Sequence, residues 1–263
     1  MKKKSLLVIS FGSSYAETRK KNITATEDAL ARAFPDYTLK RAFTSNVIIN
    51  KLKERDHLAI DTVSEAIQKL LAEGYREVLA QPLHIINGEE YHLILADLQP
   101  YAQAFTRLAI GSPLLTHHRD YVAVVNALRE VFPKDAPDEA IVLMGHGSDH
   151  PADSAYAALD YVFKDEDLPN VHVGTVEGYP TLDSIIKRLQ AGKIRKVTLV
   201  PFMLVAGDHA ENDMACDDED CWKSILTNKG YEVEARIVGL GEIEKIRQIY
   251  ISHARAALEK ESK

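Results

Sequence analysis

The sequence predicts an α/β protein of two similar Rossmann-like halves, each a parallel sheet flanked by helices, with an active-site cleft between them. Short apolar runs alternate with amphipathic stretches of ten or more residues, which is typical of βαβ units. Segments of the first half also recur, in the same order, in the second half. The length of 263 residues fits two such halves better than one domain of ordinary size.

Four strands are predicted in each half, because each run is apolar almost throughout, as strands buried on both faces are. In the first half they are Leu6–Ser10, Tyr37–Phe43, Glu77–Pro82 and Arg107–Ile110. In the second half they are Ile141–Met144, Val171–Val176, Lys196–Val200 and Val233–Val238.

Helices are predicted in the longer stretches between these strands. Thr62 followed three residues later by Glu65 indicates a capping box at the start of one of them. The helical ranges are Tyr15–Ala33, Val47–Arg55, Val63–Glu73, Glu89–Ala104, Tyr121–Val131, Ala152–Phe163, Thr181–Ala191 and Glu242–Glu259.

Three pairs of similar segments form the internal repeat. They are Leu6–Ser14 with Ile141–Asp149, Gly74–Pro82 with Gly192–Pro201, and Leu83–Glu89 with Phe202–Asp208. We expect the halves to be residues 1–133 and 138–263, because Pro133–Pro137 has the composition of a linker. The final helix is assigned to the second half, and its packing back onto the first half is left open.

Composition disfavours several classes of protein. The net charge of −7 argues against a nucleic-acid groove, which needs a concentrated basic surface. No apolar run approaches the roughly 20 residues of a membrane helix. The apolar run that follows Met1–Lys4 is too short for a secretory signal and is interpreted as a strand, so a cytoplasmic location is expected.

The two cysteines, Cys216 and Cys221, are separated by an acidic segment. On a helix, this spacing would turn the second side chain about 140° away from the first. A disulfide is therefore not expected.

Candidate functional residues follow the strands, because ligands of open α/β sheets bind beyond the carboxyl ends of the strands. The residues in such positions are Ser10, Thr44, His84, His146, Glu177 and His209. His146, Glu177 and His209 together predict a three-ligand site for a borderline divalent metal, with open coordination positions. Taken singly, the position of His146 favours a functional residue over a structural turn residue, whereas that of Glu177 favours a simple residue on the approach to a helix.

Two further groups have open interpretations. Whether His84 and Glu90 face the same cleft as His146 and His209 is left open. The acidic run after His209 either attracts cations or is a solvated helix start. No Walker loop, dinucleotide fingerprint or nucleophile elbow is present, which disfavours nucleotide chemistry and serine hydrolysis.

Several motifs support a resemblance to a known family. They are Ser10–Tyr15, Arg41–Ser45, Leu83–Tyr91, Met144–Gly147 and Leu204–Met214. With these motifs the chain resembles, nearly end to end, the anaerobic cobalt chelatases of the vitamin B12 pathway (the sirohydrochlorin cobaltochelatase family). This family is related to the class II chelatases, which include ferrochelatase. Cys216 and Cys221 stand where hydroxyl side chains are expected, which leaves a thiol-dependent metal sensitivity open.

The resemblance implies a cytoplasmic lyase that inserts Co2+ into sirohydrochlorin or precorrin-2 in anaerobic cobalamin biosynthesis. Histidine would assist deprotonation of the tetrapyrrole, and no nucleotide or organic cofactor, nucleic acid or membrane would be involved. The implied metal ligands are His146, Glu177 and His209, and the implied catalytic residues are His146, His209 and Glu90. The residues expected to bind the substrate are Ser10, Phe11, Gly12, Ser13, Thr44, His84 and Arg55.

Three alternatives stay open. The metal could be nickel or iron, since affinity order rather than ligand type separates these ions. The chain could be a non-catalytic carrier of metal or tetrapyrrole. A homo-oligomer is neither predicted nor excluded.

The carboxylates of the substrate need cationic partners. The candidates are Arg41, Lys51, Lys53 and Arg55, although a solvated helix face explains the last three equally well.

Overall fold

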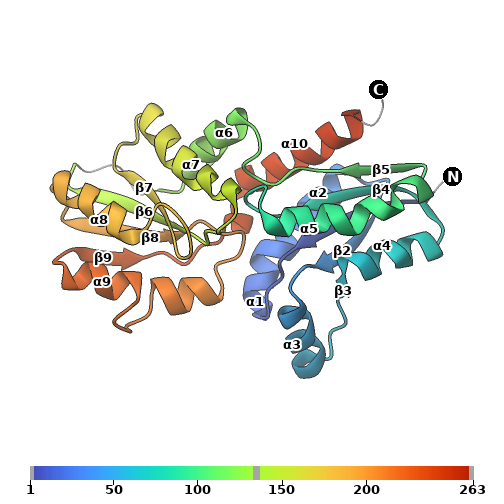
Figure 1. The fold of residues 1–263 in the computed structure, drawn as a ribbon, viewed down its shortest axis with the longest axis horizontal. Coiled ribbons are helices and arrows are strands. Elements are labelled where there is room, and N and C mark those ends of the chain that lie inside the picture. Colours follow the sequence, from blue (N-terminus) through green and yellow to red (C-terminus); the bar gives the residue numbers. More distant parts are fainter. Residues whose placement is uncertain (1–2, 133–136, 261–263) are drawn as a thin grey trace. The chain divides into compact units, whose positions relative to one another are not determined.

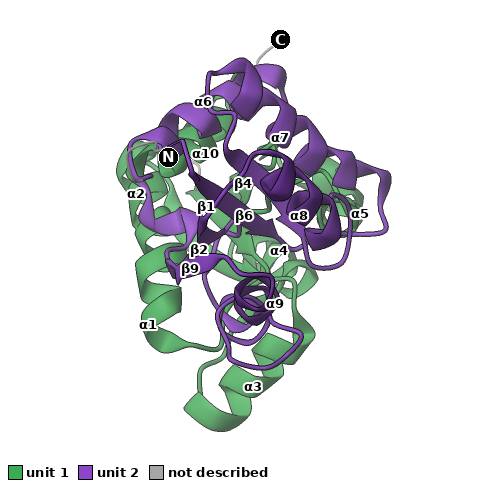
Figure 2. Cartoon of the chain, turned by 90° about the vertical axis from the view of Figure 1, so that its left-hand side faces the viewer, with its two compact units in different colours: residues 1–116, 244–263 green, residues 117–243 purple. Residues whose placement is uncertain are grey.

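The computed structural model describes residues 3–132 and 137–260 and divides the chain into two compact units. Figure 2 colours unit 1, which comprises residues 1–116 and 244–263, and unit 2, which comprises residues 117–243. Each unit contains one parallel sheet with flanking helices, which confirms the predicted two-part α/β fold. The cleft between the halves stays a prediction.

The sheet of unit 1 has the strand order β3-β2-β1-β4-β5, and Figure 1 labels β2, β3, β4 and β5. Every pairing is parallel, and the central strand β1 aligns Ser10 with Phe43 and Ile9 with Pro82. The carboxyl ends of β1, β2 and β4 therefore meet at one edge of the sheet. The strands are β1 (Lys3–Ser10), β2 (Thr38–Phe43), β3 (Asp61–Thr62), β4 (Tyr75–Pro82) and β5 (Arg107–Ile110).

Helices pack on this sheet because successive strand residues point to opposite faces. Leu7, Ile9, Val78 and Ala80 form one buried cluster with residues of α4 and α5. Helix α10 contacts β4, β5 and α2. The helices of unit 1 are α1 (Ala16–Arg19), a π-helical turn (Lys20–Thr24), α2 (Ala25–Ala33), α3 (Asn46–Asp56), α4 (Val63–Ala72), α5 (Glu89–Leu98), a 3-10 segment (Gln99–Ala104) and α10 (Glu244–Lys260).

The sheet of unit 2 has the order β7-β6-β8-β9 and is also parallel. Its strands are β6 (Glu139–Gly145), β7 (Val171–Thr175), β8 (Lys196–Pro201) and β9 (Glu232–Ala235). Val142 and Leu199 pack in a buried cluster with α8 and with Trp222 of α9. The helices are α6 (His118–Arg129), α7 (Ser154–Asp165), α8 (Leu182–Ala191) and α9 (Trp222–Asn228), with 3-10 segments at Pro151–Asp153 and Leu240–Glu242 and a π-helical turn at Ala210–Met214.

The boundary between the units differs from the expected one. The chain divides between Thr116 and His117, so that α6 belongs to unit 2, and α10 belongs to unit 1. Of the expected linker, residues 133–136 lie outside the described residues. In the described part of the chain, no helix combines the length and apolar character needed to cross a membrane.

Candidate active site

Three predicted residues of unit 1 lie together at the carboxyl edge of its sheet. Ser10 ends β1, and its carbonyl accepts a hydrogen bond from the amide of Thr44 at 3.0 Å. The amide of Leu83, which follows β4, donates to the carbonyl of Ile9 at 2.7 Å. The parallel register therefore places Ser10, Thr44 and the Leu83–His84 segment at neighbouring strand ends, as predicted for a ligand site.

The polar atoms at this edge are buried and lack protein partners. Among the described residues, no hydrogen bond satisfies the side-chain oxygens of Ser10 and Thr44, either ring nitrogen of His84, or Oε2 of Glu90. His84 Nε2 lies 3.9 Å from that Glu90 oxygen, which is too long for a hydrogen bond. Since buried polar groups are nearly always paired, these atoms are suited to polar groups of a ligand.

Burial also sets the charge of His84. Desolvation disfavours the imidazolium form and lowers the pKa of His84 to about 4. The ring is therefore neutral at pH 7, with one nitrogen that donates and one that accepts a hydrogen bond. This state suits substrate binding better than uptake of a proton.

The remaining predicted substrate residues of unit 1 have different environments. Phe11 is 51% exposed just beyond β1. Gly12 adopts a φ of +102°, and a Cβ there would come within 2.6 Å of the Phe43 ring, so only glycine fits. Ser13 is buried, and its hydroxyl accepts a hydrogen bond from an amide two residues on.

The basic candidates are partly engaged within unit 1. Arg55, near the end of α3, donates to the carbonyl of Ser14 and pairs with the neighbouring Asp56. Arg41 binds the buried carboxylate of Glu27 through two nitrogens. Arg41 is therefore held by an internal partner, whereas the side chain of Arg55 is about half exposed.

In unit 2, His146 and Glu177 follow neighbouring strands. The amide of Glu177 donates to the carbonyl of His146 at 2.8 Å, which joins the segments that leave β6 and β7. Gly147 adopts a φ of +87°, and a Cβ there would meet the backbone of Gly178. The tight turn therefore depends on glycine and brings the two predicted ligands onto adjacent segments.

The two predicted histidines of unit 2 lie against each other. The ring centroids of His146 and His209 are 4.7 Å apart, and the rings are nearly perpendicular, at 89°. Nδ1 of His146 lies 2.9 Å from the carbonyl oxygen of Gly147, and Nδ1 of His209 lies 2.6 Å from Oδ2 of Asp213. Because a carbonyl and a carboxylate only accept hydrogen bonds, both Nδ1 atoms carry the proton. In a neutral ring of this tautomer, Nε2 is the nitrogen with the lone pair that can bind a metal or a proton.

Glu177 is near this pair but is not bonded to it. Its Oε2 lies 3.8 Å from Nδ1 of His146, and its side chain is 60% exposed. Within residues 3–132 and 137–260, no three His, Cys, Asp or Glu side chains are arranged to hold a metal ion. The structure brings His146 and His209 together. The full ligand set of His146, Glu177 and His209 stays a prediction.

Two residues of this region were missed as individual functional candidates. Asp213 orients His209 from four positions further along the chain, a spacing that faces the same side of a helical turn. Asp153 accepts hydrogen bonds from the amides of Ser148 and Tyr179, and so holds together the segments that follow His146 and Glu177. The His209–Asp213 spacing was visible in the sequence, but nothing local identified Asp153.

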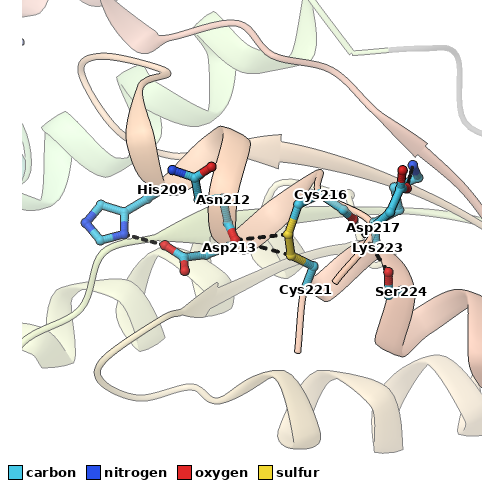
Figure 3. The surroundings of a disulfide bond; sticks show 8 residues. All are labelled: His209, Asn212, Asp213, Cys216, Asp217, Cys221, Lys223 and Ser224. Carbon is cyan, nitrogen blue, oxygen red and sulfur yellow. Dashed lines mark hydrogen bonds and ion pairs between the residues drawn. A yellow bond between two sulfur atoms is a disulfide. The ribbon is translucent and has the colours of Figure 1, made fainter. Parts of the chain in front are cut away.

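The prediction that the cysteines are not bridged is wrong. Cys216 and Cys221 form a disulfide, with their Cα atoms 5.8 Å apart (Figure 3). The prediction assumed a helix. The chain instead leaves the helical conformation after Met214 and turns before α9, so the two side chains can meet.

A protein-family model described as cobalt chelatase (CbiK) matches residues 4–259. The chain belongs to this cobalt chelatase family. The resemblance identified from the sequence motifs is thereby confirmed. Because the match spans almost all of both units, the motifs of each unit belong to one family pattern.

Two relatives of the chain are both named sirohydrochlorin cobaltochelatases. It is 48% identical over 256 residues to the sirohydrochlorin cobaltochelatase of Salmonella typhimurium, covering 97% of each chain. It is 37% identical over 261 residues to the sirohydrochlorin cobaltochelatase CbiKC of Nitratidesulfovibrio vulgaris, covering 98% of this chain and 92% of that one.

Solved structures support the fold. SirB from Bacillus subtilis matches with a TM-score of 0.67 at 13% identity, covering 99% of this chain and 98% of that one. DR2241 from Deinococcus radiodurans, described as similar to chelatases, matches with a TM-score of 0.62 at 15% identity. That match covers 97% of this chain and 55% of the other. At such identities the likeness shows a shared chelatase-like fold.

Proposed function

We propose that the chain inserts Co2+ into sirohydrochlorin and that its metal substrate is bound through the Nε2 atoms of His146 and His209. The observation that carries this proposal is the pairing of the two rings, each with Nδ1 engaged and Nε2 available. The family membership and the names of the relatives support the choice of substrates.

The donor set suits a metal that must be released again. Imidazole nitrogen binds cobalt well, whereas an all-thiolate site would hold it too firmly and an all-oxygen site would favour magnesium or calcium. Glu177 would supply a carboxylate that offsets the charge of the ion while its water ligands leave. Its exposure leaves the side chain free to approach the ion.

Metal insertion also requires the loss of two N–H protons from the tetrapyrrole. A neutral imidazole is suited to accept such a proton at about neutral pH. Each Nε2 has one lone pair, which is free for a proton only after Co2+ has left it for the ring nitrogens. We therefore assign one proton to an Nε2 atom of the unit 2 histidines once the metal has moved, and the other proton to Glu90. The buried hydroxyls of Ser10 and Thr44 and the neutral His84 would bind polar groups of the ring substituents.

Other residues of unit 1 complete the proposed substrate site. Phe11 offers an exposed aromatic ring to the apolar macrocycle, and Arg55 offers a guanidinium to a carboxylate. Gly12 and Ser13 form the turn that presents Phe11. The proposed reaction uses no nucleotide or organic cofactor. We propose that the protein acts in the cytoplasm.

The test compares His146→Ala and His209→Ala with the unchanged chain in sirohydrochlorin metallation by Co2+, Ni2+ and Fe2+. We expect each variant to lose Co2+ insertion above the spontaneous rate and to keep its circular dichroism and unfolding midpoint. His118→Ala, which alters an exposed histidine of α6, should keep full activity.

Two results would contradict the proposal. Near-normal rates in both variants would refute the role of the histidines. An unchanged chain that binds Co2+ and sirohydrochlorin but does not accelerate insertion would be a carrier. The relative rates with the three metals identify the preferred ion.

A further inference from the structure

The Cys216–Cys221 disulfide lies between two elements of unit 2. Cys216 comes two residues after the π-helical turn Ala210–Met214, and Cys221 caps the start of α9. Cys221 is fully buried, and the next residue, Trp222, packs in the core of unit 2. Cys216 is only partly buried. The bond therefore ties a partly exposed turn to a fixed point in the core.

The bridge is in contact with the segment that orients His209. The sulfur atoms of Cys216 and Cys221 lie 2.9 Å and 3.2 Å from the carbonyl oxygen of Asn212. The following residue is Asp213, whose carboxylate holds Nδ1 of His209 at 2.6 Å (Figure 3). Two consecutive residues, Asn212 and Asp213, thus connect the disulfide to the candidate metal-binding imidazole: Asn212 contacts the sulfur atoms, and Asp213 contacts His209.

We propose that Cys216 and Cys221 are a reversible thiol–disulfide site whose redox state sets the affinity of the His209 side of the metal site for Co2+. The coupling to Co2+ rests on the proposed function of His209, whereas the redox site does not. With the bridge closed, the segment after Asp213 has few conformations available, and the carboxylate is held toward His209. With the bridge open, that restraint is lost and His209 is oriented less firmly.

The chemistry is thiol–disulfide exchange with a small external disulfide. The thiolate of the partly exposed Cys216 attacks the external disulfide, forms a mixed disulfide and releases one thiol. The thiolate of Cys221 then attacks the Cys216 sulfur, forms the internal bridge and releases the second thiol. Two cysteines lose two protons and two electrons, and the external disulfide becomes two thiols.

Charge selects the external partner. The four residues between the cysteines, Asp217 to Asp220, are all acidic, and they are exposed. Lys223 pairs with the first of them, Asp217, at 2.8 Å, which leaves the others without that compensation. An anionic disulfide is repelled by this segment, so a neutral or cationic disulfide should react faster.

The first experiment follows the thiols. The reduced chain is treated with cystamine, which is cationic, or with glutathione disulfide, which is anionic. We expect loss of both free thiols, a mass lower by two hydrogen atoms with no adduct, and a faster reaction with cystamine. Cys221→Ser should instead keep a mixed disulfide on Cys216. A stable adduct on the unchanged chain, or no reaction, would overturn the redox site.

The second experiment measures Co2+ affinity of the oxidised and reduced chain by calorimetry after removal of the reagents. We expect reduction to weaken binding roughly three- to tenfold, which is less than the ten- to hundredfold effect of losing an outer-shell partner, because Asp213 itself is still present. The double variant Cys216→Ser, Cys221→Ser should bind Co2+ equally after either treatment.

Three results would overturn the coupling. Equal affinities of the two forms would show that the bridge does not act on His209. A thiolate-to-cobalt absorption band in the reduced chain would show that the cysteines bind the metal themselves. Absence of Co2+ binding in both forms would contradict the proposed function and the coupling together, while the thiol measurement would still judge the redox site.

Discussion

The orientation of the His209 imidazole depends on one carboxylate. Asp213 engages Nδ1 at 2.6 Å, which fixes the tautomer and leaves Nε2 to face a ligand. His146 obtains the same tautomer from a backbone carbonyl instead. A side-chain partner can be changed by substitution, so the importance of orientation is directly testable at His209.

We predict that Asp213→Asn lowers Co2+ affinity by roughly ten- to a hundredfold, because outer-shell partners of ligating histidines have effects of this size. Calorimetric titration at constant pH measures the change. Asp217→Asn, which alters a 93% exposed carboxylate in the same acidic region, is the matched control and should bind as the unchanged chain does. Equal affinities for the two variants would refute the orienting role.

The buried His84 predicts a pH dependence of stability. Unfolded His84 takes up a proton near pH 6.5, but the folded chain resists protonation until about pH 4. Acid therefore favours the unfolded state, so the free energy of unfolding decreases as the pH falls from 6.5 towards 4. By linkage, it amounts to about 2 kcal/mol between pH 7 and pH 5. The buried His172, with a pKa also lowered to about 4, acts in the same direction.

Denaturant unfolding at pH 7 and pH 5 tests this prediction. His84→Gln should lose about 2 kcal/mol less free energy of unfolding between these pH values than the unchanged chain. The comparison is made within each protein, so a constant destabilisation by the substitution cancels. His118→Gln, at an exposed position, should show the pH dependence of the unchanged chain; the same slope in His84→Gln would disprove the assignment.

At the scale of elements, the turn after β6 leaves no room for a side chain at Gly147. Gly147 combines a positive φ with close approach to Gly178. Gly74 has a similar φ of +80°, but a Cβ at that position would have no neighbouring atom within 4 Å. A comparison of Gly74 with Gly147 therefore separates the cost of the backbone conformation from the cost of close packing.

We predict that Gly74→Ala costs roughly 1–2 kcal/mol, the cost of a left-handed conformation. Gly147→Ala should cost a further 1–3 kcal/mol or so, because the backbone of Gly178 must move. This movement also displaces Glu177, so Co2+ affinity should fall only in Gly147→Ala. Unfolding and titration of both variants provide the measurements, and equal stability losses would show that the turn is not closely packed.

Sequence patterns predicted the long elements well and the short ones poorly. The apolar runs indicated the strands of both sheets except β3, which has only two residues. The capping box at Thr62 and Glu65 is present as predicted. Helix α9 was missed because seven residues contain too few turns for a periodic pattern. The helix that starts at Glu89 ends as an α-helix at Leu98, because Pro100 follows.

For the site, position after a strand was the useful criterion. It selected His146, Glu177, Ser10, Thr44 and His84, because parallel strands bring their carboxyl ends together. It did not reveal which polar groups hold those residues. The hydrogen bonds of Asp153 join segments that are distant in the chain, and the cysteine bridge depends on a turn between Met214 and Trp222 that no local sequence pattern indicates.

At the scale of the whole molecule, unit 1 depends on a helix that follows unit 2 in the sequence. Tyr250 of α10 is fully buried, and its hydroxyl donates to the carbonyl of Leu83 at 3.0 Å, next to His84. Helix α10 thus supports the strand end that presents a predicted substrate residue.

We predict that Tyr250→Phe costs about 1 kcal/mol, the usual size of one hydrogen bond. Tyr250→Ala should cost roughly 3–5 kcal/mol, because it also leaves a cavity in the core. Denaturant unfolding gives both values. A small loss in the alanine variant would show that α10 is not essential to the stability of unit 1.

The course of the chain has a consequence for biosynthesis. Residues 117–243 form a complete unit, whereas the first 116 residues lack their last helix, α10, until synthesis has passed residue 260. During translation, the later unit can finish folding while the earlier one still exposes the apolar surface that α10 covers. We therefore expect the nascent chain to be most prone to aggregation just before α10 leaves the ribosome.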